Sequence, residues 1–163
     1  MVITLHEAKD TAEWEQACAL LQHVYLHGGY TTAENAAAMM TRERLQGEGT
    51  LLVAEGEQHT LVGAVLFLNA DSGLRQLANE GEREFRMLGV HPEARGSRAG
   101  EALVRACMEW ARDGGASALV LWTRPTMPAA HRLYERLGFV RAPERDVPDT
   151  RGFTRLVYVW RPA

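Results

Sequence analysis

The chain has 163 residues, of which 46% are apolar and 24% charged, the proportions of an ordinary globular protein with a sizeable core. Its net charge of −3 argues against a general nucleic-acid-binding protein, and no apolar run approaches the roughly 18–20 residues of a transmembrane helix. The amino terminus has no secretory pattern, and Cys18 and Cys107 have no metal-binding or redox spacing. We therefore expect a single cytoplasmic domain over residues 1–163 that binds neither nucleic acid nor membrane.

Charge is unevenly distributed along the chain. Residues 1–80 carry four basic and eleven acidic side chains, whereas residues 81–163 carry fourteen basic and ten acidic ones. The second half can therefore hold a polyanion while the first half faces a cationic ligand. A solvated surface explains the same counts, and the sequence leaves both interpretations open.

Apolar spacing and turn residues predict alternating strands and helices. A helix begins at Asp10 or Thr11 and ends before Gly28. The pattern predicts further helices over 32–45, from Arg98 to the residue before Gly114, and over 128–137. It predicts strands over 2–7, 51–55, 61–68, 82–90, 118–122, 139–141 and 153–160, with a loop over 69–81. Hairpins connect the middle strands and helices connect the later ones, so the sheet should be mixed.

The segment GVHPEARGSRAGEAL, residues 89–103, resembles an anion-binding turn. Pro92 cannot donate to a sheet, so the strand should end near Val90, and the backbone N–H groups from Gly96 to Glu101 then precede or open a helix. Unpaired N–H groups at a helix N-terminus favour phosphate, and Arg95 and Arg98 add positive charge. An ordinary strand-to-helix connection has a similar composition, so this segment alone does not decide the matter.

A second segment, AHRLYERLGFV at residues 130–140, follows the first, and the two together are more informative than the first alone. Together the two segments resemble the GNAT superfamily of N-acetyltransferases, which transfer an acyl group from acyl-CoA to an amine. The matching residues are Val90-His91-Pro92, Arg95 and Gly100, then Ala130, Leu133-Tyr134 and Gly138-Phe139. Two positions depart from the family pattern: Arg98 replaces a glycine, and Met127 replaces a frequent asparagine. We expect Arg98 to present its N–H from right-handed helical geometry.

The resemblance implies an α/β fold with a mixed, largely antiparallel central sheet flanked by helices. It implies acetyl transfer from acetyl-CoA to a primary amine by direct attack, without a metal. The pyrophosphate cradle would consist of Arg95, Gly96, Ser97, Arg98, Ala99, Gly100 and Glu101. Around Leu88 and Val90 the strand would pair with pantetheine, and the Val90 N–H would polarise the thioester carbonyl. Tyr134 would protonate the departing thiolate.

Glu84 is the candidate general base, because it lies six residues before Val90, where some members of the family carry a catalytic glutamate. Even spacing places Glu84, Arg86, Leu88 and Val90 on one strand face if no bulge intervenes. An exposed carboxylate, or one paired with Arg86, is the alternative interpretation.

The sequence says least about the residues that bind the acceptor. Tyr25, Tyr30 and Glu34 are candidates for lining its site, and the acidic first half fits a cationic small-molecule or peptide amine. His23 and His27 lie one helical turn apart, but no third metal ligand is near them in the sequence. A non-catalytic CoA-binding module and a nucleotide-phosphate-binding module are the alternative functions, and a homodimer is left open.

Overall fold

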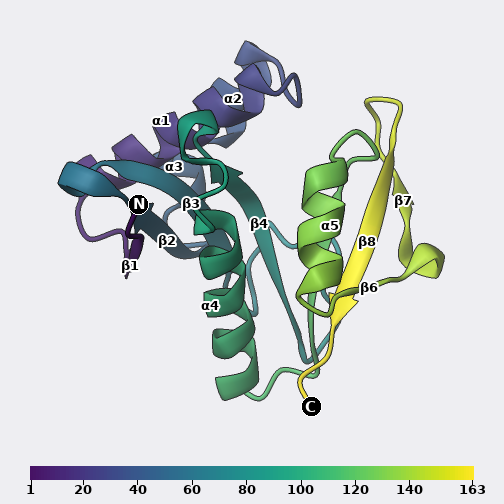
Figure 1. Cartoon of the computed structure of the whole chain (residues 1–163). Helices are drawn as coiled ribbons and strands as arrows, with labels where there is room; N and C mark the ends of the chain where they lie inside the picture. The colour runs from purple at the N-terminus through teal and green to yellow at the C-terminus, as the bar shows by residue number, and fades with distance from the viewer.

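The computed structural model describes all residues from 1 to 163, and a single mixed sheet runs through its centre (Figure 1). The strand order is β1-β2-β3-β4-β5-β8-β6, with β7 paired to β8. Only the β4–β5 pair is parallel. The bounds are β1 Thr4–Glu7, β2 Gly49–Glu55, β3 Leu61–Leu68, β4 Glu82–Val90, β5 Ala118–Thr123, β6 Val140–Arg141, β7 Val147–Pro148 and β8 Thr154–Trp160. This confirms the mixed, largely antiparallel sheet, whereas β7 was not predicted.

Helices cover both faces of the sheet (Figure 1). On one face, α1 (Thr11–His27) packs against β3 and β4, and the Asp10 side chain caps it by accepting from the Glu13 N–H at 2.9 Å. On the other face lie α4 (Ala99–Asp113) and α5 (Pro128–Arg136). The apolar side of α4 is completely buried at Leu103 and Cys107, and each fully buried large apolar side chain contributes roughly 1.5–3 kcal/mol. No helix has both the length and the apolar character needed to cross a membrane.

The single helix predicted over 32–45 is wrong, because the chain forms two short helices there. These are α2 (Ala33–Met39) and α3 (Arg42–Leu45). Between them Thr41 adopts an extended backbone, and its hydroxyl accepts from the Arg44 N–H at 3.3 Å. A threonine that caps a new helix offers the backbone an alternative to continuing the old one.

Strands β4 and β5 diverge after a short stretch of pairing, and this divergence positions the site. Their register covers only Glu82–Glu84 against Ala118–Val120. Beyond Glu84, β4 continues for six residues to Val90, and beyond Val120, β5 continues to Thr123 without pairing to β4. The opening therefore lies at the carboxyl ends of two parallel strands, where ligands bind in open α/β sheets.

A β-bulge lies in the part of β4 that pairs with β3 but no longer pairs with β5. Arg86 pairs with Leu66, and Gly89 pairs with Ala64, so two residues of β4 oppose one residue of β3. Met87 takes a left-handed φ of 62° within this bulge. The extra residue changes which side chains share a face.

The bulge corrects the expectation that Glu84, Arg86, Leu88 and Val90 share a face. Arg86 is opposite Leu66, whose side chain belongs to the core beneath α1. Leu88 and Val90 instead pack against the core beneath α4. Glu84 and Arg86 therefore face the α1 side, and the residues after the bulge face the α4 side.

Candidate active site

The loop after β4 leaves backbone N–H groups free at the start of α4. His91 still belongs to the sheet edge, since its N–H donates to the Val62 carbonyl at 2.7 Å. The chain then passes through a 3₁₀ turn at Pro92–Ala94 and reaches α4. The first intrahelical bond runs from the Ala102 N–H to the Arg98 carbonyl, so the N–H groups of Gly100 and Glu101 have no partner. Such groups bind anions at helix N-termini.

Arg98 adopts the left-handed conformation, with φ 68° and ψ 19°, immediately before α4. The expectation of right-handed helical geometry at this position is therefore wrong. In the left-handed conformation, the Cβ of a residue lies too close to the following carbonyl oxygen, and this contact costs roughly 1–2 kcal/mol. Glycine has no Cβ and does not bear this cost. The backbone turn needed to open α4 thus explains why glycine suits this position.

Positive charge surrounds the free N–H groups. A hollow is lined by Arg98, Glu101, Arg105 and Arg136. Glu101 is paired with Arg136 at 3.0 Å and with Arg105 at 3.5 Å, and the hydrogen bond from Arg136 lowers the pKa of that carboxyl. Three guanidinium groups and one carboxylate leave a surplus of positive charge beside the helix N-terminus. Phosphate groups match this arrangement. Arg95, Gly96 and Ser97 precede it on the loop, and Ala99 begins the helix.

Val90 has a backbone N–H that faces the opening between the strands. Its neighbour His91 donates to β3, and N–H groups alternate in direction along a strand, so the Val90 N–H points away from β3. The strand that would accept from it, β5, has already diverged. This leaves a hydrogen-bond donor available to a ligand in the opening.

Tyr134 is buried on the α4 side, with only 5% of its surface exposed. Its ring packs against Phe85, Phe139 and Tyr158, which fixes its orientation. Its hydroxyl has no hydrogen-bond partner in the protein and is not sealed from solvent. Burial raises the pKa of Tyr134 far above its usual range, and nearby Tyr25 raises it further. The side chain is therefore a neutral donor at physiological pH.

Tyr25 reaches the bulge from α1. Its hydroxyl donates to the Leu88 carbonyl at 2.9 Å, and burial raises its pKa to about 12. Tyr25 reaches β4 from the α1 face of the sheet, whereas Tyr134 packs in the core on the α4 face. Of the residues predicted to line the acceptor site, Tyr25 lies at the opening, and the Tyr30 carbonyl accepts from Arg124 beside it. Glu34 is exposed near the start of α2 and makes no hydrogen bond or ion pair.

Glu84 is 1% exposed, and its carboxylate organises the loop before β4. Its Oε1 accepts from the backbone N–H groups of Gln76, Leu77 and Ala78 at 3.0–3.1 Å, and Oε2 also lies 3.2 Å from the Gln76 nitrogen. These bonds satisfy a loop that would otherwise bury unpaired donors. The alternative that Glu84 is an exposed carboxylate is therefore wrong.

Sequence reasoning missed a group of arginines on the α1 side of the opening. Arg86 comes from β4, Arg124 follows β5, and Arg151 and Arg155 come from the β7–β8 hairpin. These positions are far apart in the chain, so no local motif marks them. The excess of basic residues after residue 80 was the only signal.

The two histidines that are one turn apart, His23 and His27, both lie on α1. His23 stacks on His27 and on His91, with ring centroids 5.9 and 5.3 Å apart. No group of three or more His, Cys, Asp or Glu side chains is arranged to hold a metal ion.

Comparison with known proteins identifies the family. The profile of the acetyltransferase (GNAT) family matches residues 9–139. An N-acetyltransferase of Schizosaccharomyces pombe is 34% identical over 56% of this chain and 52% of its own length. The mycothiol acetyltransferase of Paenarthrobacter aurescens is 32% identical over 82% of this chain and 40% of its own length. The chain thus spans about half or less of these relatives.

Solved structures share the fold. The PaiA N-acetyltransferase of Thermoplasma acidophilum, in complex with coenzyme A, superposes with a TM-score of 0.75 at 14% identity, covering 99% of this chain and 100% of that one. A GNAT-family acetyltransferase of Staphylococcus aureus gives 0.77 at 13% identity, covering 98% and 99%. With the profile match over most of the chain, the conclusion is that this protein belongs to the GNAT family of acetyltransferases.

Proposed function

We propose that this protein transfers the acetyl group of acetyl-CoA to a primary amine by direct attack. The donor would lie on the α4–α5 side of the opening between β4 and β5, and the acceptor would enter from the α1 side. The observation that carries this proposal is the divergence of the strands, which leaves the Val90 N–H free at the end of β4, the strand whose Phe85 packs against the Tyr134 ring.

The loop and the start of α4 fit a pyrophosphate. The free N–H groups of Gly100 and Glu101 and the surplus charge of Arg98, Arg105 and Arg136 would bind it. Gly100 fits a close approach, since a Cβ there would lie 3.6 Å from Val90 and 3.7 Å from Leu133, and a longer side chain would fill that space. Leu88 and Val90 would pair with the pantetheine arm.

Two groups of the chain would act on the thioester that acetyl-CoA supplies. The Val90 N–H would donate to the carbonyl oxygen as negative charge develops there, a contact that strengthens in the transition state. Tyr134 would donate its proton to the leaving sulfur. Its raised pKa keeps that proton in place until the sulfur becomes basic.

The amine must lose a proton before or during attack. An alkylamine with a pKa near ~10.4 is only about a thousandth neutral at pH 7. Glu84 is the proposed base, and because its carboxylate already accepts backbone N–H groups, it would act through water. The geometry supports a loop-anchoring role for Glu84 more directly.

Replacing Tyr134 with phenylalanine tests the proposal. We expect Tyr134→Phe to lower kcat by about 100-fold, the lower range for general acid catalysis, with little change in KM for acetyl-CoA. Release of CoA thiol against a panel of amines measures both. Tyr158→Phe is the matched control, since it removes a hydroxyl in the same aromatic cluster that bonds only to Glu135.

Unchanged turnover in Tyr134→Phe would remove its role as acid. If the wild-type protein binds acetyl-CoA but acetylates no amine of the panel, the function is that of a non-catalytic CoA-binding module.

A further inference from the structure

The arginine group on the α1 side of the opening consists of Arg86, Arg124, Arg151 and Arg155, and we call it the arginine wall. The Arg155 guanidinium lies over the Trp122 ring at 4.9 Å, and the Arg124 guanidinium lies over the Phe153 ring at 3.9 Å. Trp122 and Phe153 are themselves neighbours, with ring centroids 6.0 Å apart. Cation–π contacts of this kind hold guanidinium groups in place while leaving their edges free to donate.

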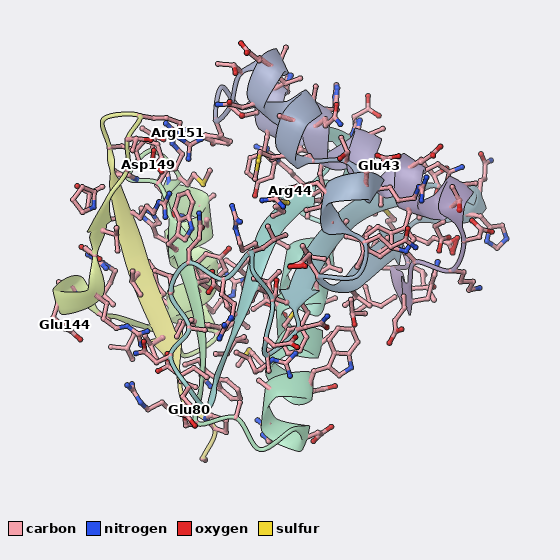
Figure 2. The ribbon with its side chains drawn as sticks, turned by 180° about the vertical axis from the view of Figure 1, so that it is seen from behind. Glu43, Arg44, Glu80, Glu144, Asp149 and Arg151 are labelled. Carbon is pink, nitrogen blue, oxygen red and sulfur yellow. The ribbon has the colours of Figure 1, made fainter.

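The tip of the β7–β8 hairpin completes the wall. Figure 2 shows Asp149 and Arg151 at the same end of the molecule as α2. Across the opening, Arg124 donates to the carbonyl of Tyr30 in the α1–α2 connection. The wall therefore bridges the two halves of the sheet at their diverging end.

Charge in this wall is not balanced. Asp149 accepts from Arg151 at 2.9 and 3.0 Å and from Arg155 at 2.9 Å. Arg86 and Arg124 have no carboxylate within 4.0 Å and each makes only one hydrogen bond, to a backbone carbonyl. Glu84 is near Arg86 but accepts backbone N–H groups. Four guanidinium groups and two carboxylates leave two positive charges unmatched.

The arginines also repel one another. Burial lowers the pKa of Arg86, Glu84 and Tyr25 oppose this shift, and the positive charges of Arg155 and Arg151 lower the pKa further. Burial and Arg151 act in the same direction on Arg124. An anion in the wall relieves this repulsion and supplies partners for the free N–H groups.

We propose that the acceptor amine also carries a carboxylate, as an amino acid does, and that Arg86 and Arg124 bind that carboxylate. This inference rests on the proposed function and adds the substrate class. Arg86 directly precedes the bulge formed by Met87 and Leu88. A carboxylate held there places a nearby amine at the opening. The cationic acceptor suggested by the acidic first half of the chain does not fit this wall.

Matched pairs of amines test the inference. CoA release is measured with the twenty L-amino acids and with their carboxamides, which keep the amine and lose the negative charge. Among the amino acids with a primary amine, we expect kcat/KM for the preferred one to exceed that for its carboxamide by at least tenfold. Equal or better turnover of carboxamides or of polyamines overturns the inference while leaving acetyl transfer established.

Variants locate the carboxylate site. Arg86→Gln and, independently, Arg124→Gln should raise KM for the preferred amino acid at least tenfold and should reduce turnover of the carboxamide far less. Arg86→Lys should retain part of the preference. The control is Arg83→Gln, which alters an arginine of β4 that lies over Phe67 and donates to the Leu68 carbonyl. Equal losses on both members of a pair contradict the proposal.

A binding measurement separates failure of this inference from failure of the proposed function. If no amine is acetylated, the proposed function fails. Calorimetric titration of the same pairs into the CoA-saturated protein then decides the carboxylate site. Binding of amino acids but not carboxamides, lost in Arg86→Gln, supports the site, and equal or absent binding of both overturns it.

Discussion

Two kinds of residue near the proposed site are unusual: some have a strained backbone, and one tyrosine has a raised pKa. Arg98 holds a left-handed conformation that its side chain disfavours, and Met87 does the same in the bulge of β4. Backbone strain of this kind persists where the surrounding structure enforces it and is frequent at functional sites. Tyr134, by contrast, is well packed but has an unpartnered hydroxyl whose pKa is raised by burial. Both features lie beside the proposed path of the donor.

Replacing Arg98 with glycine should stabilise the protein. Glycine adopts φ 68° without the steric cost borne by arginine, so we expect Arg98→Gly to raise the free energy of unfolding by about 1 kcal/mol, or Tm by roughly 2–4 °C. Thermal unfolding followed by circular dichroism measures the change. Gly96→Ala is the opposite control, because Gly96 has φ 84° with open space around it, and only conformational strain can destabilise that variant. A lower Tm for Arg98→Gly would contradict the assignment of strain.

At the scale of elements, the proposed CoA site combines the amino end of α4 with the free edge of β4. The Val90 side chain lies close to Gly100, and Leu133 of α5 approaches the same glycine. A side chain longer than a methyl group at position 100 would therefore press on Val90 and Leu133 beside the free N–H groups at the start of α4.

Filling the space beside Gly100 should weaken CoA binding more than removing the positive charge of Arg98. We expect Gly100→Leu to raise the Kd for CoA at least tenfold, since its side chain would occupy the space between Val90 and Leu133. Arg98→Ala should raise it only about threefold, because Arg98 is exposed and screened. Isothermal titration gives both values. Equal or reversed losses would show that side-chain charge, and not the backbone cradle, dominates binding.

The whole molecule consists of two half-sheets joined near one end. Pairing between β4 and β5 covers three residues on each strand, and the Arg145–Glu82 ion pair at 2.9 Å lies at that joined end. Arg145 also donates to the Leu77 carbonyl in the loop anchored by Glu84. The joined end therefore ties the two halves together, while β4 and β5 remain unpaired at the other end.

Removing Arg145 should weaken the joined end in a pH-dependent way. Burial acts to raise the pKa of Glu82, but the hydrogen bond from Arg145 prevails and lowers it. A carboxyl with a lowered folded-state pKa adds stability above its unfolded pKa of about 4.3 and loses it as pH falls through the folded value. We expect Arg145→Gln to cost about 1.5–3 kcal/mol at pH 7, with the difference from wild type shrinking below about pH 4.

Urea denaturation from pH 3.5 to 7 measures this difference. Arg136→Gln serves as the control, because its pair with Glu101 is 60% exposed on the arginine side and should contribute no more than about 1 kcal/mol. A constant difference across this pH range would show that the pair with Glu82 is not the source of the effect.

The sequence by itself determined most of the element order, the family and the loop that opens α4, but not β7 or the division of the helix over 32–45. Apolar periodicity and turn residues are local, and Val90-His91-Pro92, Gly100 and Leu133-Tyr134 lie within short segments at a recognisable separation. Local information did not reveal the break at Thr41, where a side-chain cap competes with the helix, or the left-handed backbone of Arg98, which depends on how the turn must close.

Only the tertiary structure decided which side chains face the opening. One extra residue in β4 moves Glu84 and Arg86 to the opposite face from Leu88 and Val90, and a bulge is specified by pairing with β3 rather than by the spacing within β4. Likewise, Arg124 and Arg155 come together over the neighbouring rings of Phe153 and Trp122 only because distant segments converge where the sheet divides. The sequence contains these arginines, and strand pairing determines which face of the sheet they occupy.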